Sequence, residues 1–311
     1  MADNHPGLGG ISLVLGGNPF GWTIGRDASF AVLDAFYEAG GRSIDTAEGY
    51  SSWIPGNKGG ESETIIGEWM ESRNVRKDMK IATKTGMGGP PGALAPDKVA
   101  AACQGSLERL RSDWIDLYYV HRDDRVTPVN EVVSGYNALV SAGKVRELAV
   151  SNTQADRLSA FNADAGARGL MPFTVMQPGY NLIWRSEYPA ELEALAVEQG
   201  MAALPYYGLA SGFLTGKYGP DHDFAGMRGG NAKQFASELG WAALPVVKAV
   251  AQERGETMGQ VALAWLASRP AVWGPIASGT TPEQVRELCA SASVTLNGDQ
   301  LARLNAVSID G

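Results

Sequence analysis

Short apolar runs rich in β-forming residues alternate with longer helical patterns along the whole chain. The runs expected to be strands are 11–17, 42–46, 79–84, 115–121, 145–151, 173–177, 202–207 and 272–277. The helical patterns cover 27–39, 61–73, 97–111, 129–142, 155–167, 187–199, 243–254 and 282–290, with an additional helix at 258–268. The strands are almost continuously apolar rather than alternating, as expected when both faces of a parallel sheet are buried.

This rhythm predicts an α/β fold in which residues 1–311 form a single (β/α)₈ TIM-barrel domain. Helix starts carry the expected proline signals at Pro96-Asp97 and Thr281-Pro282-Glu283. The alternative is an open doubly wound sheet, but no GxGxxG motif follows the first strand to support it.

Residues 208–240 interrupt the rhythm. They are rich in glycine and show no clear strand or long helix. Loops of this length in a compact domain are usually functional or disordered. Because the segment follows the seventh strand, we expect a flap at the mouth of the barrel that covers a bound cofactor. A solvated insertion is the alternative.

Composition excludes several classes of partner. An apolar fraction of 44% and a charged fraction of 19% are typical of a globular protein, and the net charge of −8 argues against nucleic-acid or anionic-membrane binding. Cys103 and Cys289 are the only cysteines and provide neither a disulfide framework nor metal-ligand spacing. No secretory signal is visible, and no apolar run approaches the ~20 residues of a membrane helix. We therefore expect a cytoplasmic protein.

Four polar residues lie at or just beyond the ends of apolar runs in the first half of the chain. They are Asp45, Tyr50, Lys84 and His121, within GGRSIDTAEGY, MKIATKTG and DWIDLYYVHR. In a parallel barrel, the carboxyl ends of neighbouring strands converge on one mouth. An acid, a phenol, an amine and an imidazole together suit the delivery of a proton to a carbonyl oxygen while a hydride reaches its carbon.

Each of the four residues has an expected role. Tyr50 is the candidate general acid, and its phenol needs a pKa below the usual ~10 for efficient exchange near neutrality. We expect Lys84 to lower that pKa and Asp45 to keep the buried Lys84 charged. His121 would hydrogen-bond the carbonyl oxygen. Taken singly, these residues have ordinary explanations in packing or solvation, and their joint occurrence is what favours chemistry.

At this point the chain resembles the aldo-keto reductase superfamily. The similar segments are GRSIDTAEGYS (41–51), IATK (81–84), YYVHR (118–122), SN (151–152), Gln177, LASGFLTGKY (209–218) and PIASGTTPEQV (275–285). They occur in the family's order over essentially the whole chain. The resemblance implies a (β/α)₈ barrel and reversible, NADP(H)-dependent carbonyl reduction, with Tyr50 as proton donor supported by Asp45, Lys84 and His121.

The resemblance also implies a set of cofactor-binding residues. Ser151, Asn152 and Gln177 would hold the nicotinamide carboxamide, and Tyr206, or its neighbour Tyr207, would stack on the ring. The rest of the implied cofactor-binding set comprises Leu209, Ser211 and Lys217 at the pyrophosphate, and Ser278, Thr280 and Gln284 after the last strand, with Gln284 at the adenine.

The segment after the last strand departs from the family pattern. Many members have a Lys or Arg there that grips the 2′-phosphate, whereas this chain has Gly279, Thr280 and Thr281, with no basic side chain before Arg286. Hydroxyl groups and helix-start N–H groups can still bind a phosphate, so we expect NADP(H) with possible use of NAD(H). Arg228 is a candidate for the missing positive charge.

Aromatic residues near the mouth suggest a substrate lining. Trp22, Trp53 and Trp184 each follow a strand, although each could be rim packing. The expected partner is a small carbonyl compound such as an aldehyde, ketone or sugar. One alternative is a slow cofactor-binding sensor of the kind attached to potassium channels. A metal-dependent barrel hydrolase or lyase is disfavoured by the presence of only three histidines.

Overall fold

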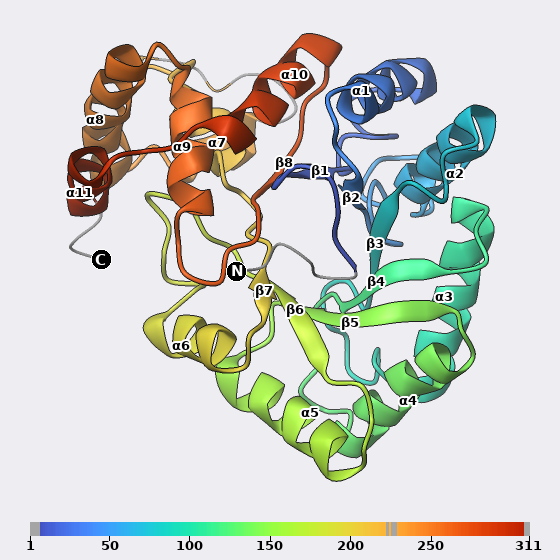
Figure 1. Ribbon diagram of the computed structural model, residues 1–311. Coiled ribbons are helices and arrows are strands. Elements are labelled where there is room, and N and C mark those ends of the chain that lie inside the picture. The colour runs from blue at the N-terminus through green and yellow to red at the C-terminus, as the bar shows by residue number, and fades with distance from the viewer. Residues whose placement is uncertain (1–6, 222–223, 225–228, 308–311) are drawn as a thin grey trace.

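Eight parallel strands form one curled sheet with helices packed around it (Figure 1). The computed structural model describes residues 7–221, 224 and 229–307. The spatial order is β7-β6-β5-β4-β3-β2-β1-β8, so strands are neighbours in chain order and β1 also pairs with β8. A doubly wound sheet would reverse its order at a switch point, and the strands in the described residues show no such reversal. The strands are β1 Val14–Gly16, β2 Ser43–Asp45, β3 Lys80–Thr85, β4 Ile115–Val120, β5 Val145–Ser151, β6 Phe173–Gln177, β7 Ala202–Ala203 and β8 Ile276–Ala277.

Backbone hydrogen bonds also connect β7 to the segment that leads into β8. The amide of Ala203 donates to the carbonyl of Ala271 at 2.8 Å, and the amide of Trp273 donates to the carbonyl of Ala203 at 3.1 Å. The amide of Ile276 reaches the carbonyl of Pro205 at 2.8 Å. The two edges of the curled sheet therefore lie close together.

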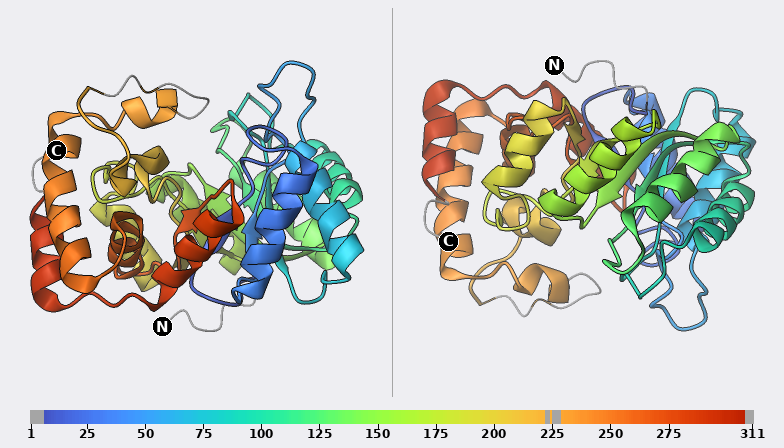
Figure 2. Two further views of the ribbon diagram at one scale, coloured as in Figure 1. Left: turned by 90° about the horizontal axis from the view of Figure 1, so that it is seen from above. Right: turned by 90° about the horizontal axis from the view of Figure 1, so that it is seen from below.

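The helices surround the sheet, as two further views show (Figure 2). They are α1 Arg26–Glu38, α2 Glu61–Arg73, α3 Pro96–Leu110, α4 Val129–Ser141, α5 Ala155–Ala167, α6 Ala190–Glu198, α7 Gly229–Lys233, α8 Glu238–Arg254, α9 Met258–Ala267, α10 Pro282–Ala290 and α11 Gly298–Ala306, with the 3₁₀ helices η1 Ala210–Thr215 and η2 Ser291–Ser293. Among the residues that the structure describes, no helix is both long and apolar enough to cross a bilayer.

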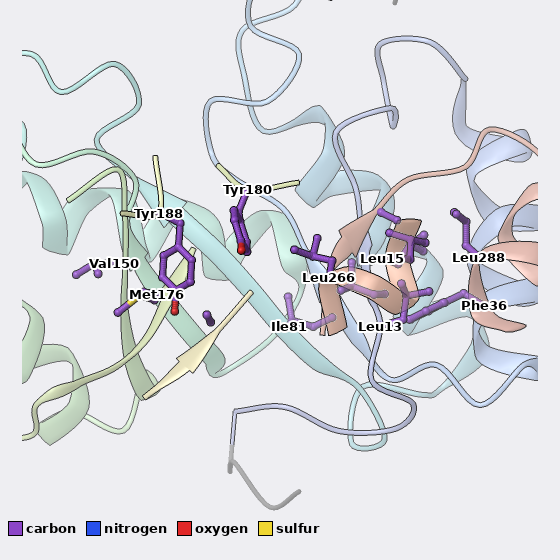
Figure 3. Close-up of a cluster of buried hydrophobic side chains, with 14 of the residues drawn as sticks. Leu13, Leu15, Phe36, Ile81, Val150, Met176, Tyr180, Tyr188, Leu266 and Leu288 are labelled. Carbon is purple, nitrogen blue, oxygen red and sulfur yellow. The ribbon is translucent and has the colours of Figure 1, made fainter. Parts of the chain in front are cut away.

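Alternate residues of each strand face two different cores. In β4, Leu117 and Tyr119 belong to a small cluster inside the curl, while Tyr118 and Val120 belong to the large cluster between sheet and helices. Figure 3 shows part of the large cluster, including Leu13, Leu15 and Phe36. Because side chains alternate between faces, His121 follows Tyr119 by the two positions that return it to the inner face.

Several boundaries differ from the sequence prediction. Helix α6 begins at Ala190 rather than residue 187 because Pro189 is its N-cap. Helix α8 begins at Glu238, five residues before the predicted start at 243, where the Ser237 side chain accepts from the Gly240 amide. The internal Pro245 made that start hard to predict. Helix α11 was not predicted, although Asn297 and Gln300 form a capping box at its start.

Residues 208–240 were predicted to contain no clear strand or long helix, and the part described contains only short helices and the start of one longer helix. That part includes η1, α7 and the first residues of α8. The role of this segment as a cofactor cover stays a prediction. Strands β1, β7 and β8 are also shorter than predicted.

Candidate active site

A buried ion pair between Asp45 and Lys84 forms the centre of the site. Asp45 ends β2 and is level with Ala82 of β3, so Lys84 lies two residues further along β3 on the same face. Lys84 is completely buried. Its Nζ donates to Asp45 Oδ2 at 2.5 Å, to the carbonyl of Thr46 at 2.8 Å and to the hydroxyl of Tyr50 at 3.0 Å.

Tyr50 and His121 complete the group. The Tyr50 hydroxyl donates to Asp45 Oδ2 at 3.3 Å while accepting from Lys84. The rings of Tyr50 and His121 meet edge to face, with 6.1 Å between their centroids. His121 Nδ1 is buried and has no hydrogen-bond partner among the described residues. The structure therefore brings together all four residues predicted from the strand ends.

The pKa of Tyr50 differs from expectation. Burial raises the pKa of the Tyr50 phenol well above its usual value, and the negative charge of Asp45 raises it further. The prediction of a phenol pKa below the usual ~10 is therefore wrong for the free protein. The physical reason is that the ammonium is already paired with Asp45, whose opposite charge offsets its field at the phenol. The phenol is consequently held protonated at neutral pH.

The other two titratable groups also respond to burial. Burial lowers the pKa of the Lys84 ammonium, while the adjacent Asp45 opposes that change. For His121, burial first, the charge of Lys84 second and that of Arg122 third lower the pKa to about 3. The imidazole is therefore neutral near pH 7 and can donate one hydrogen bond without carrying charge.

A second polar group lies at the ends of β5 and β6. Gln177 Nε2 donates to Asp45 Oδ1 at 2.8 Å, and Ser151 Oγ donates to the carbonyl of Gln177 at 2.8 Å. Asn152 adopts a positive φ of 47° and accepts from the Tyr206 hydroxyl at 3.0 Å. Gln177 thus contacts the central ion pair, and a chain of hydrogen bonds connects it to Ser151, Asn152 and Tyr206. The role of these four residues toward a cofactor stays a prediction.

The predicted pyrophosphate residues lie in and after η1. Ala210, Ser211 and Gly212 have consecutive positive φ values of 50°, 55° and 88°. Leu209 and Ser211 are partly buried, and Lys217 is exposed with its Nζ 5.0 Å from the ring centroid of Tyr218. These consecutive left-handed residues bend the backbone, so this segment is not a regular helix.

The segment after β8 is held by local hydrogen bonds. Ser278 Oγ donates to the carbonyl of Gly16 at 2.8 Å, while the Thr280 amide and hydroxyl both donate to Gln284 Oε1, at 2.8 and 3.1 Å. Thr281 caps the start of α10. Arg228, the candidate for an additional positive charge, lies outside the described residues.

The three predicted substrate tryptophans fall into two separate places. Trp22 and Trp53 meet edge to face at 5.4 Å, and the Trp53 ring is 6.5 Å from that of Tyr50. Trp184 instead packs 6.1 Å from Tyr206 and borders a cavity of about 190 Å³ that is also lined by Phe235. The structure therefore associates Trp22 and Trp53 with Tyr50, but not Trp184.

Sequence reasoning missed three contributors. The Thr46 carbonyl accepts from Lys84, and the ring of Tyr119 lies 5.6 Å from Lys84 Nζ. Glu48 Oε1 accepts from Thr85 Oγ1 at 2.6 Å, which ties the segment after β2 to the end of β3. Tyr119 could have been found from strand alternation, because it precedes His121 by two residues. A backbone carbonyl gives no sequence signal.

Comparisons with known proteins agree with this geometry. The family model described as "Aldo/keto reductase family" matches residues 12–309. A probable aryl-alcohol dehydrogenase of Saccharomyces cerevisiae is 32% identical, covering 92% of this chain and 89% of that protein. The NADP(+) aryl-alcohol dehydrogenase of Phanerodontia chrysosporium is 31% identical, covering 96% and 80%. A norsolorinic acid reductase of Aspergillus flavus is 30% identical, covering 89% and 70%.

The chain belongs to the aldo/keto reductase family and is an oxidoreductase that acts on carbonyl groups. Among the described residues, no group of His, Cys, Asp and Glu side chains could hold a metal ion.

Proposed function

We propose that this enzyme uses NADP(H) to interconvert an aromatic aldehyde or ketone and the corresponding alcohol, with Tyr50 as proton donor. The observation that carries the proposal is that Lys84 Nζ contacts both partners at once: it lies 2.5 Å from Asp45 Oδ2 and 3.0 Å from the Tyr50 hydroxyl. The names of the relatives, aryl-alcohol dehydrogenases and norsolorinic acid reductases, support the aromatic class.

The residues present fit a nicotinamide dinucleotide. An amide side chain at Gln177 and a hydroxyl at Ser151 supply donors and acceptors of the kind that bind a carboxamide. At the other end, the start of α10 offers helix N–H groups to a phosphate, and the Thr280 hydroxyl could exchange its bond to Gln284 for one to the phosphate. When bound, the reduced cofactor supplies the hydride.

The chain's own residues donate the proton and stabilise the charge that its transfer leaves behind. The Tyr50 hydroxyl is held protonated and donates its proton to the oxygen as negative charge develops there. Lys84 then stabilises the phenolate that remains, because its ammonium lies within hydrogen-bond distance. Neutral His121 hydrogen-bonds the same carbonyl oxygen and orients it. In the alcohol-to-carbonyl direction the phenolate would accept the proton instead.

We also propose that the curled sheet closes as a (β/α)₈ barrel and that residues 1–311 form one domain. The backbone hydrogen bonds that Ala203 donates to Ala271 and accepts from Trp273 support closure. A cytoplasmic location stays a prediction from the sequence.

A screen of carbonyl compounds, followed by the loss of NADPH absorbance, tests the proposed activity. We expect steady multiple turnover with aryl aldehydes or aryl ketones. Tight NADPH binding without turnover on any aryl, aliphatic or sugar carbonyl would contradict the proposal and favour a cofactor sensor.

A further inference from the structure

The segment directly after β3 presents a single large apolar side chain. Residues 86–89 read Gly-Met-Gly-Gly, and Gly86, Gly88 and Gly89 have φ values of 82°, 78° and 62°. These left-handed conformations favour glycine, so the tight path of the backbone leaves Met87 as the one side chain that this turn projects. Met87 is 39% exposed, which is unusual for a large apolar residue in this molecule.

Contacts on both sides fix this turn. Glu48 Oε1 accepts from the Gly86 amide at 3.1 Å and from the Thr85 hydroxyl at 2.6 Å. At the other end, a side chain at Gly89 would meet Arg122 Cγ at 3.0 Å, so the two segments are packed closely. Met87 is therefore held in place by its neighbours rather than carried on an unsupported loop.

Met87 lies against the backbone that positions Tyr50. A Cβ atom added to Gly49 would be 2.6 Å from Met87 Sδ, so the thioether rests directly on the residue before the proposed proton donor. Trp53 approaches Tyr50 from its own segment and is 45% exposed. Figure 2 shows the segments after β2 and β3 projecting on the same side of the sheet as α7.

Each of these two side chains, both exposed near Tyr50, suits a flat apolar group. A thioether is polarizable and makes favourable contacts with aromatic rings, while an indole packs well against another ring. Covering both would remove exposed apolar surface from water. We propose that Met87 is a specificity-determining residue that, together with Trp53, contacts the ring of an aryl carbonyl substrate. This inference rests on the proposed role of Tyr50.

The test compares an aryl aldehyde with a short aliphatic aldehyde. Benzaldehyde and propanal are assayed with wild type, Met87→Ala and the control Val197→Ala, which alters an exposed apolar residue on α6. We expect kcat/KM of Met87→Ala to fall ~10-fold for benzaldehyde, equivalent to ~1.4 kcal/mol, and by less than ~2-fold for propanal. Met87→Leu restores most of the loss because it retains apolar volume.

The ratio of kcat/KM for benzaldehyde to kcat/KM for propanal decides the result. An unchanged ratio of kcat/KM in Met87→Ala relative to wild type overturns the role of Met87, since a general loss of structure would affect both aldehydes alike. If Met87→Ala does not fold, Met87→Gln gives the same test, with the ratio expected to fall. Tyr50→Phe is assayed in parallel: its full activity would instead refute the proposed function itself.

Discussion

Two buried aspartates lie at opposite ends of the strands. They differ in whether the polar groups around them all have hydrogen-bond partners. Asp45, 2% exposed, ends β2 and pairs with Lys84; Asp116, 1% exposed, is the second residue of β4 and pairs with Arg76 at 2.8 Å. Both are ion pairs withdrawn from water, which by itself indicates neither stability nor function.

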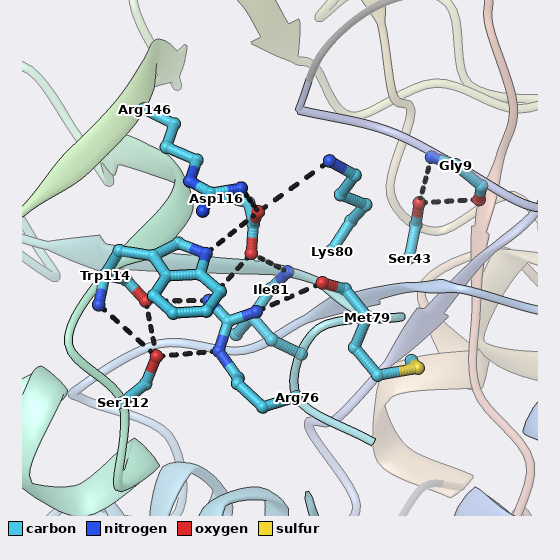
Figure 4. Close-up of polar contacts among 10 residues, drawn as sticks. All are labelled: Gly9, Ser43, Arg76, Met79, Lys80, Ile81, Ser112, Trp114, Asp116 and Arg146. Atoms are coloured by element: carbon cyan, nitrogen blue, oxygen red, sulfur yellow. Dashed lines mark hydrogen bonds and ion pairs between the residues drawn. The ribbon is translucent and has the colours of Figure 1, made fainter.

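At the Asp116 end, every guanidinium nitrogen of Arg76 has a partner (Figure 4). Its Nε donates to Ser112 Oγ at 2.7 Å, its Nη1 to the carbonyl of Met79 at 3.1 Å, and its Nη2 to Asp116 and to the carbonyl of Trp114. The guanidinium also lies 4.2 Å from the Trp114 ring centroid. This pair is fully used in holding strands and loops together.

At the Asp45 end, a buried polar atom near the ion pair has no hydrogen-bond partner among the described residues. The Tyr50 hydroxyl has Lys84 and Asp45 as neighbours, yet His121 Nδ1 has no partner within the described residues. A buried ion pair thus marks a reactive site when titratable groups with unused hydrogen-bonding atoms surround it. We therefore expect substitutions at the two ends to affect different quantities.

The largest combined effect is expected for Lys84→Met. It removes the charge that stabilises the phenolate and leaves Asp45 buried without a partner. We expect kcat to fall by at least ~100-fold. Because the pKa of Tyr50 rises further without the ammonium, the pH limb caused by phenol ionisation should move to higher pH. Steady-state rates across a pH series measure both, and an unmoved limb with more than roughly a tenth of the activity would show that Lys84 is only structural.

Asp116→Asn should have the opposite profile. Breaking a buried pair costs about 3–5 kcal/mol of unfolding free energy, because Arg76 is left with an uncompensated charge. The kcat of the folded protein should stay within about 2-fold, an effect of less than one tenfold step of ~1.4 kcal/mol. Urea unfolding measures the loss of unfolding free energy, and steady-state assays measure kcat. Asp156→Asn is the control, because its pair with Arg125 is largely exposed and should contribute less than ~1 kcal/mol.

A smaller, pH-dependent effect is expected from His121. Its folded-state pKa of about 3 lies below the unfolded value of ~6.5, so protonation favours the unfolded chain. The stability contributed by the neutral imidazole is fully present above pH ~6.5 and is lost as the pH falls toward 3, by about 2 kcal/mol at pH ~5. The unfolding free energies of wild type and His121→Asn, each measured at pH ~7 and pH ~5, test this. An equal loss in both proteins would contradict the assignment to His121.

The smallest effect concerns cofactor choice at the edge of the site. With Thr280 in place of a basic residue, we expect NADPH to be preferred over NADH by less than ~100-fold. Thr280→Arg should raise the preference, because a guanidinium binds phosphate through two hydrogen bonds. The ratio of kcat/KM for the two cofactors measures it. A wild-type ratio of ~1,000-fold or more would place the phosphate on another cation.

The sequence was most informative where strand ends determine position. Asp45, Lys84 and His121 were predicted to meet because parallel neighbouring strands bring their carboxyl ends together, and this was confirmed geometrically. The alternating rhythm likewise predicted all eight strands in their order. Both inferences depend on local pattern alone.

Long-range effects were less predictable. The direction of the Tyr50 pKa depended on how strongly burial and Asp45 outweigh Lys84, which strand position does not reveal. Trp184 was grouped with Trp22 and Trp53 because all follow strands, but the length and path of each loop decide where an aromatic ring lies. Helix α11 was missed because its capping box was not recognised in the sequence.

The most direct test of the different roles of the two ion pairs is the activity and stability of Tyr50→Phe. This change removes only the phenolic oxygen that Lys84 contacts at 3.0 Å. We expect a kcat at least ~100-fold below wild type, with NADPH affinity and unfolding free energy almost unchanged. Retention of more than roughly a tenth of the wild-type kcat, in a protein that folds and binds NADPH normally, would contradict it.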